Sequence, residues 1–134
     1  MGAEAKEIRI FDAVALAQPP PVDGDDGIPV DPVWPGTVEL RLRSAAASGT
    51  RTIRAIAWGW QANVLDTSGV PISGSGAWHP LFDTGTENSA TDKNYAYPLG
   101  LLPYSRLAIS IPDVPGGTTP AATASFALGS PDAV

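Results

Sequence analysis

The chain contains no cysteine, one histidine and only two lysines, Lys6 and Lys93. The lack of cysteine excludes disulfide bonds, thiolate metal sites and cysteine nucleophiles, although it excludes no cellular compartment. The single histidine, His79, limits how acid–base catalysis could be built, because histidine is the side chain most often used for it. These absences disfavour an enzyme and favour a protein without a cofactor.

Long apolar runs are also missing. Residues 1–16 are interrupted by charged side chains, so they lack the apolar segment of a signal peptide, and no later run reaches membrane-spanning length. The sequence has no Asn-x-Ser/Thr acceptor for glycosylation. We therefore expect a soluble protein that is made in the cytoplasm without a signal peptide and has no membrane partner.

Positive charge is scarce, with 8 basic residues against 14 acidic ones and a net charge of −6. Such a balance supports solubility and disfavours general binding to DNA or to acidic membranes. The basic residues are also not interleaved with aromatic ones, as they are in many nucleic-acid-binding surfaces. We expect no nucleic-acid partner.

Glycine and proline are abundant, with 14 of each in 134 residues. Proline is excluded from helix interiors and central strands, so its spread along the chain favours many short strands joined by turns. No stretch of ten residues keeps a 3.6-residue apolar period free of Pro or Gly, so little helix is expected. The length fits one domain, residues 1–134.

Apolar and polar residues alternate in several segments, most clearly in residues 37–43, where apolar side chains share one side and charged ones the other. The other predicted strands are 7–17, 51–65, 70–72, 77–82, 95–102, 104–111 and 121–128. Their number and spacing predict an all-β fold, a single antiparallel β-sandwich or jelly-roll-like domain of seven or eight strands.

Trp58 and Trp60 alternate with small residues in the segment 51–65, which has apolar residues on both faces and should be a central strand. Two tryptophans on one face of a strand can stack on a sugar, but a tryptophan there more often fills the core, since it buries a large area. We interpret them as core residues. The small residues opposite would then face a closely approaching sheet or subunit.

Residues 18–36 form a Pro- and Asp-rich segment that cannot be a helix or a central strand. Its apolar side chains would be costly to leave in water, and its prolines reduce the entropy lost on docking. We predict that this Pro-rich segment is an extended N-terminal arm or loop that lies along a surface of this chain or of a neighbour. Its interface candidates are Ile28, Val30, Trp34 and the acidic Asp25 and Asp26.

Four arginines, Arg41, Arg43, Arg51 and Arg54, fall on one predicted hairpin and hold half of the basic charge. Like charges on neighbouring strands repel, so the cluster predicts acidic partners. The aspartates of the Pro-rich segment could supply them, in this chain or in another copy. The alternative is a solvated face with Glu39 as a local partner.

No residue pattern fixes a chemistry. His79 lies between Trp78 and Pro80, and no Gly-x-Ser-x-Gly nucleophile elbow is present to use it. The acidic run 23–27 departs from the EF-hand pattern, which requires Gly at position 6 and Glu at position 12. We expect no catalytic residue, no metal and no cofactor, with a non-EF-hand calcium site in that run as an open alternative.

This profile predicts a non-enzymatic structural or assembly protein, most simply a bacteriophage virion component such as a capsid-decoration or tail accessory protein. Its partners would be other protein subunits, either copies of itself in a homo-oligomer or capsid and tail proteins. The alternative is a carbohydrate- or ligand-binding β-sandwich module. Its stacking candidates are Trp78, His79, Tyr95 and Tyr97, with Trp34 as a further loop aromatic.

Overall fold

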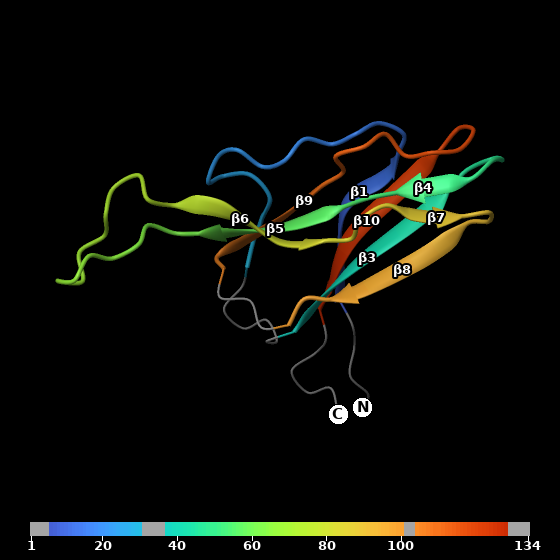
Figure 1. Ribbon diagram of the computed structural model, residues 1–134. Helices are drawn as coiled ribbons and strands as arrows, with labels where there is room; N and C mark the ends of the chain where they lie inside the picture. Colours follow the sequence, from blue (N-terminus) through green and yellow to red (C-terminus); the bar gives the residue numbers. More distant parts are fainter. Residues whose placement is uncertain (1–5, 31–36, 101–103, 129–134) are drawn as a thin grey trace, which may run out of the picture.

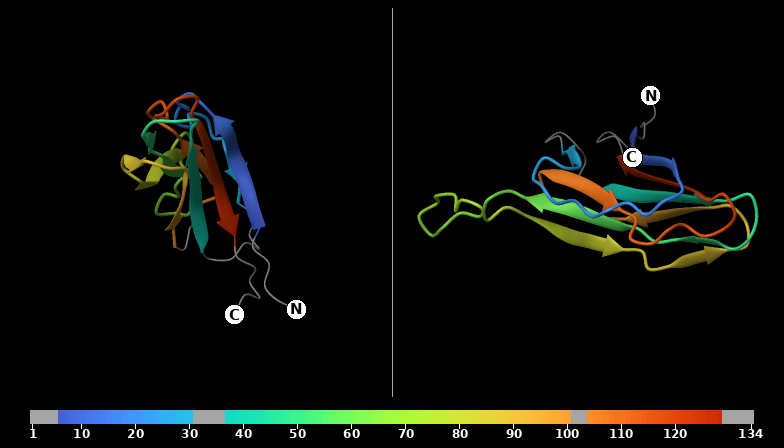
Figure 2. Two further views of the ribbon diagram at one scale, coloured as in Figure 1. Left: turned by 90° about the vertical axis from the view of Figure 1, so that its right-hand side faces the viewer. Right: turned by 90° about the horizontal axis from the view of Figure 1, so that it is seen from above.

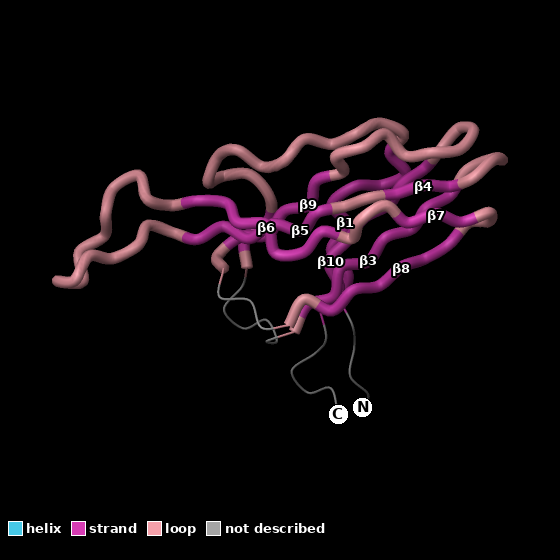
Figure 3. The backbone as a smooth tube through the Cα atoms, viewed as in Figure 1, coloured by secondary structure: helices cyan, strands magenta, loops and turns pink. Residues whose placement is uncertain are grey.

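A computed structural model describes residues 6–30, 37–100 and 104–128 of the chain. These residues form ten strands, all paired antiparallel (Figures 1 and 3), and contain no helix that could cross a membrane. The prediction of an all-β fold is confirmed. The strands are β1 Lys6–Val14, β2 Ile28–Pro29, β3 Val38–Ala45, β4 Arg51–Ile53, β5 Ile56–Gln61, β6 Ala77–Asp83, β7 Glu87–Ser89, β8 Lys93–Pro98, β9 Arg106–Ser110 and β10 Ala121–Leu128.

The number of strands in the described residues exceeds the seven or eight expected. The difference arises from β2, β4 and β7, which are only two or three residues long. Pairs this short carry too little alternation to be recognised in a sequence. β4 and β7 pair only with each other, as a separate two-stranded sheet.

The first sheet has the strand order β1-β10-β3-β8. In β3, Val38, Leu40 and Leu42 are buried while the charged residues between them are partly or fully exposed, as the alternation predicted. β10 lies between β1 and β3 and places the fully buried Phe126 opposite Ile8 on one side and Leu40 on the other. One face of this sheet therefore supplies half of the core.

The second sheet has the strand order β2-β9-β5-β6. In its strand β5, small residues face the core. The buried residues of β5 are Ala57 and Gly59, whereas Trp58 and Trp60 lie on the opposite face and are only partly buried. The interpretation of the two tryptophans as core residues is therefore wrong. A Cβ on Gly59 would lie 2.5 Å from the Tyr104 ring, so the inner face has no room there for a larger side chain.

Buried side chains from both sheets belong to one hydrophobic cluster. Alanine is frequent in this cluster, so the backbones of the two sheets can approach closely. This agrees with the prediction that the face of β5 with small side chains meets another sheet. The cluster consists of Val38, Leu40, Leu42, Ile53, Ala55, Ala57, Leu107, Ile109, Ile111, Ala122, Ala124, Phe126 and Leu128.

Residues 18–30, the described part of the Pro-rich segment, lie against the second sheet of their own chain. Gln18 and Ile111 exchange two backbone hydrogen bonds of 2.8 and 3.0 Å. Ile28 then pairs with Leu107 in β9, which makes β2 an edge strand, a position where proline is tolerated. Ile28 and Val30 pack against the core cluster, so this part of the segment covers the body of the chain.

The run 51–65, expected as one strand, is divided into β4, β5 and the beginning of a projection. Residues 62–76, which we call the arm, connect β5 to β6 and extend well beyond both sheets (Figure 1, left; Figure 2, right panel). Residues 62–74 of the arm are all exposed. The arm is thus the largest described feature that has no place in the core.

Candidate functional site

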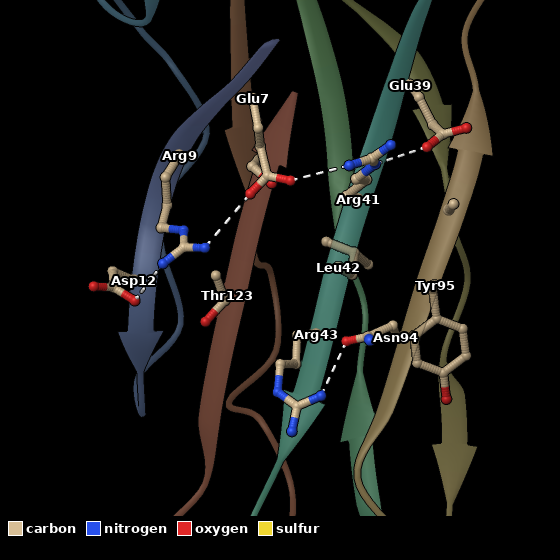
Figure 4. A pocket seen from close by; sticks show the side chains of 12 residues that line it. Glu7, Arg9, Asp12, Glu39, Arg41, Leu42, Arg43, Asn94, Tyr95 and Thr123 are labelled. Carbon is tan, nitrogen blue, oxygen red and sulfur yellow. Dashed lines mark hydrogen bonds and ion pairs between the residues drawn. The ribbon is translucent and has the colours of Figure 1, made fainter. Parts of the chain in front are cut away.

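Arg41 and Arg43 project from the outer face of β3 over a shallow groove of about 690 Å³ (Figure 4). Arg41 donates a hydrogen bond from Nε to Glu39 at 2.8 Å, and its Nη1 lies 3.2 Å from a Glu7 oxygen. Arg43 donates to the Asn94 side chain at 3.1 Å. The guanidinium groups of this face are thus held by neighbours on the same sheet.

Arg51 and Arg54 lie outside that groove. The Arg51 side chain is only 12% exposed and pairs with Asp92 at 2.9 Å. Arg54 binds the Asp83 carboxylate through two parallel contacts of 3.0 and 2.5 Å. Arg43 lies 3.8 Å from the same Asp92 carboxylate, so Arg43 and Arg51 are neighbours, whereas Arg54 pairs elsewhere. The four arginines therefore do not converge on one groove, and each has an acidic partner nearby. This arrangement agrees with the alternative of local pairing.

The contact between Arg54 and Asp83 predicts a pH dependence of stability. Hydrogen bonds from Arg54 and from the Gly85 amide lower the pKa of Asp83 to about 2. Because this value lies below the ordinary 3.8, the stabilisation is complete above about pH 4 and is lost as the pH falls toward 2. Solvent screening limits it to about 0.5–1 kcal/mol, since Asp83 is 42% exposed.

Asp83→Asn should therefore lower the free energy of unfolding at pH 7 by that amount and leave the stability near pH 2 almost unchanged. Urea unfolding at pH 7, 4 and 2.5 measures the effect. The matched control is Asp113→Asn, whose carboxylate lies 3.7 Å from Arg54 and is 63% exposed. An equal loss at pH 7 in both variants would contradict the assignment to Asp83.

The acidic loop 23–27 is held by Arg106 and not by the four arginines. Arg106 donates to the backbone carbonyls of Asp26 at 2.8 Å, Asp25 at 2.9 Å and Gly27 at 3.0 Å. The Asp26 carboxylate accepts the amides of Val22 and Asp23, and these bonds lower its pKa. No sequence pattern singles out Arg106, because it is an isolated arginine at the start of a strand.

The aromatic pair Trp60 and Trp78 lies where this loop meets the outer face of the second sheet. Their ring centroids are 5.5 Å apart, and the Trp78 indole donates to the Asp23 carbonyl at 2.8 Å. His79, the next residue of β6, points to the other face, with its ring 6.2 Å from that of Tyr104. Trp78 and His79 therefore cannot stack on the same ligand.

Tyr95 and Tyr97 lie on the inner face of β8, opposite Leu42 and Leu40 of β3. Tyr97 packs against Phe82 and donates to Glu87 at 3.0 Å. Burial, followed by Glu87, raises the pKa values of both tyrosines. Tyr95 and Tyr97 stack on each other, with ring centroids 6.5 Å apart, but Trp78 and His79 lie elsewhere and on opposite faces of β6. Trp34 lies outside the described residues.

Comparison with known proteins gives no further identification of these features. No family model, curated protein or solved structure matches this chain. Within the described ranges, no group of three or more His, Asp or Glu side chains is placed to hold a metal ion. The candidate functional site is therefore assigned from the exposed side chains of the described residues.

The arm is the strongest candidate, because local hydrogen bonds order it while its aliphatic side chains stay in solvent. The Asp66 carboxylate accepts the amides of Ser68 at 2.8 Å and Val70 at 2.9 Å, which closes the turn. Nearer the body, Asn63 accepts the Gly76 amide at 2.9 Å, and the Ser75 hydroxyl accepts the Val64 amide at 2.8 Å. Hydrogen bonds from polar side chains, and not a hydrophobic core, thus hold the conformation of the arm.

The aliphatic residues of the arm are distributed unequally over its two faces. Leu65 bridges Pro71, and the Ile72 amide donates to the Val64 carbonyl. This register places Val64, Val70 and Ile72 on one face, which we call the apolar strip, and Leu65 with Pro71 on the other. Asp66, opposite Val70, lies at the tip end of the same face as the strip. The exposed fractions are 41% for Val64, 55% for Val70, 47% for Ile72 and 60% for Leu65.

From the sequence, this region is predicted as the end of one strand, 51–65, and a short strand, 70–72. The structure instead places both in the projecting hairpin, which has a single bridge, Leu65 to Pro71, and no strand. One signal was present: between Arg54 and Asp83 the only charged side chain is that of Asp66. Exposed hairpins usually carry charges that keep them apart from other chains. An uncharged, turn-rich stretch with Val, Leu and Ile could therefore have been recognised as a contact surface.

Proposed function

We propose that this chain is a non-enzymatic structural or assembly protein that contacts neighbouring subunits through the arm. The observation that carries the proposal is the exposed apolar strip on an ordered hairpin. Burying a Val or Ile side chain is worth about 1.5–3 kcal/mol, and on the arm this stabilisation is unused by the chain itself. Contiguous exposed apolar side chains of this kind are typical of protein–protein contacts.

The edges of the two four-stranded sheets favour the arm as the contact element, because each of these four edges carries a feature that hinders further pairing. β2, β6 and β8 contain Pro29, Pro80 and Pro98. β1 has two register shifts and a positive φ of 51° at Ala13. Such features hinder edge-to-edge association through the two larger sheets.

We assign no catalytic role to His79. No hydrogen bond from the described residues orients its imidazole, and its ring neighbour is Tyr104. A general base needs a partner that fixes its tautomer and direction. The ligand-binding alternative also has less support than the assembly role, because Trp78, His79 and the two tyrosines do not converge.

The finer architecture that we propose is an antiparallel β-sandwich of the jelly-roll kind, supported by the core that both sheets share. A cytoplasmically made sandwich with a projecting hairpin suits a virion component, such as a capsid-decoration or tail accessory protein in a homo-oligomeric arrangement. In this proposal the interface candidates Ile28 and Val30 do not contact a partner themselves. They pack against the core and so hold the acidic loop 23–27 in place beside the arm. Trp34 remains a predicted contact of the Pro-rich segment.

Sedimentation of a lysate from the cells that naturally produce the chain tests the proposal. We expect the chain to co-sediment with large particles in a sucrose gradient, together with capsid or tail proteins identified by mass spectrometry. Recovery of the whole population in the slow fractions, as free chain, would overturn the assembly role.

A further inference from the structure

We propose that the groove on the outer face of the first sheet binds a neutral, polyhydroxylated ligand, a short stretch of a linear oligosaccharide. The groove lies on a different surface from the arm, so this binding goes beyond the assembly role and does not depend on it. It also uses polar side chains and not the aromatic stacking of the ligand-binding alternative. Three features support it: the shape of the groove, its balanced charge and its free hydrogen-bonding groups.

The groove exists because a middle strand of the sheet has small side chains on its outer face. Thr123 and Ser125 of β10 lie between the longer side chains of β1 and β3, and Figure 4 shows Thr123 between Arg9 and Arg43. Beyond β3, the lining residue Ala96 of β8 is also small. From the strand spacing, a groove that crosses four strands is roughly 15 Å long, which suits a short linear chain better than a single small ion.

The charges of the groove are balanced. Its lining contains three guanidinium groups and three carboxylates, from Arg9, Arg41, Arg43, Glu7, Asp12 and Glu39. Ion pairs connect these groups to one another or to Asp92 beside the groove. An anion would have to compete with the carboxylates for the guanidinium groups, and a cation would have to compete with the guanidinium groups for the carboxylates. The balance therefore favours a ligand without charge.

The ion pairs leave hydrogen-bonding capacity of both kinds at the groove. A guanidinium group has several N–H donors and a carboxylate has several lone-pair sites, so one ion pair does not saturate either. The Arg43 side chain donates to Asn94 at 3.1 Å and is still 50% exposed. The Thr123 hydroxyl accepts the Ala13 amide at 3.1 Å, so its own proton is free to be donated. Since a hydroxyl group both donates and accepts, neighbouring hydroxyls of a sugar ring can bond to this mixture without breaking an ion pair.

The same lining is unlike a protein or nucleic-acid contact. Charged residues are depleted at the centres of protein interfaces, whereas here they form the walls of the groove. A nucleic acid would meet the carboxylates of Glu7, Asp12 and Glu39, which repel its phosphates. Because the groove is shallow and its hydrogen bonds form in competition with water, we expect weak binding, with a dissociation constant of about 1 mM.

Titration of the isotope-labelled full chain with neutral oligosaccharides, followed by the NMR shifts of its amides, tests the proposal. The probes are linear hexasaccharides of the amylose, cellulose, mannan and xylan types, each added to about 10 mM so that millimolar binding is detected. At least one of them should shift the amides of Thr123, Ser125 and Ala96, while the amides of the arm stay unchanged.

A pair of asparagine variants shows whether the groove itself binds the sugar. Asn94→Ala removes a polar side chain of the groove and should weaken binding about threefold to tenfold, because a hydrogen-bonding group is lost. Asn88→Ala is the matched control, since it removes the same exposed side chain from β7, outside the groove, and should bind as the parent does. The amide spectra of both variants also report whether the fold is retained.

Three results would overturn the proposal: groove amides that are unchanged by all of the neutral probes, equal weakening by Asn94→Ala and Asn88→Ala, or a preference for a charged sugar. The last is measured with a hexamer of galacturonate. Binding about tenfold tighter than that of any neutral probe, lost in about 0.5 M NaCl, would show an anion site. None of these results bears on the proposed function, because the groove residues lie outside the arm.

Discussion

Phe126→Ala is expected to lower the free energy of unfolding by about 3–5 kcal/mol and the melting temperature by roughly 10–20 °C. Phe126 is fully buried at the centre of the first sheet, between Ile8 of β1 and Leu40 of β3. Removing its ring leaves a cavity that three paired strands cannot easily close. Urea and thermal unfolding followed by circular dichroism measure the loss.

Phe82→Ala is the matched control, because it removes the same ring from a position that is 37% exposed. We expect it to cost less than half as much, through the lost contact with Tyr97. Equal losses in the two variants would contradict the placement of the core between β10 and the second sheet.

The sequence predicted β3, β9 and β10 well because large apolar residues recur at every second position in each. In β3 the residues between them are exposed or half-buried, whereas in β9 and β10 small residues such as Ala108 and Ser125 are buried on the second face as well. The sequence misassigned β5, where large and small residues alternate and either face could be the inner one. The decisive fact is that Tyr104 lies directly over Gly59, a contact between residues far apart in the chain. Alternation identifies the two faces of such a strand, but the space between the sheets decides which of them is buried.

The candidate sites also depend on contacts between residues that are far apart in the chain. The acidic loop and the four arginines were each visible in the sequence, but their partners depend on pairing between distant strands. Arg54 lies just before β5 and meets Asp83 at the end of β6, whereas the loop meets Arg106 of β9. The arm was missed for a different reason. Exposed aliphatic residues in a turn-rich stretch have the same pattern as a short buried strand, so alternation alone cannot separate the two.

The central claim is that the arm serves assembly and not the fold, and a replacement of residues 62–76 by an Asn-Gly turn separates these roles. Gln61 and Ala77 are directly paired, so a two-residue turn can join β5 to β6 without changing their register. Because residues 62–74 are exposed, the shortened chain should melt within about 5 °C of the parent. A much larger drop would show that the arm supports the body.

The most direct measurement is co-sedimentation of the shortened chain, produced in place of the parent in its natural cells, with large particles in a sucrose gradient. The parent should be found in the particle fractions, and the folded, shortened chain should remain in the slow fractions. Incorporation of the shortened chain into particles at the level of the parent would contradict the account.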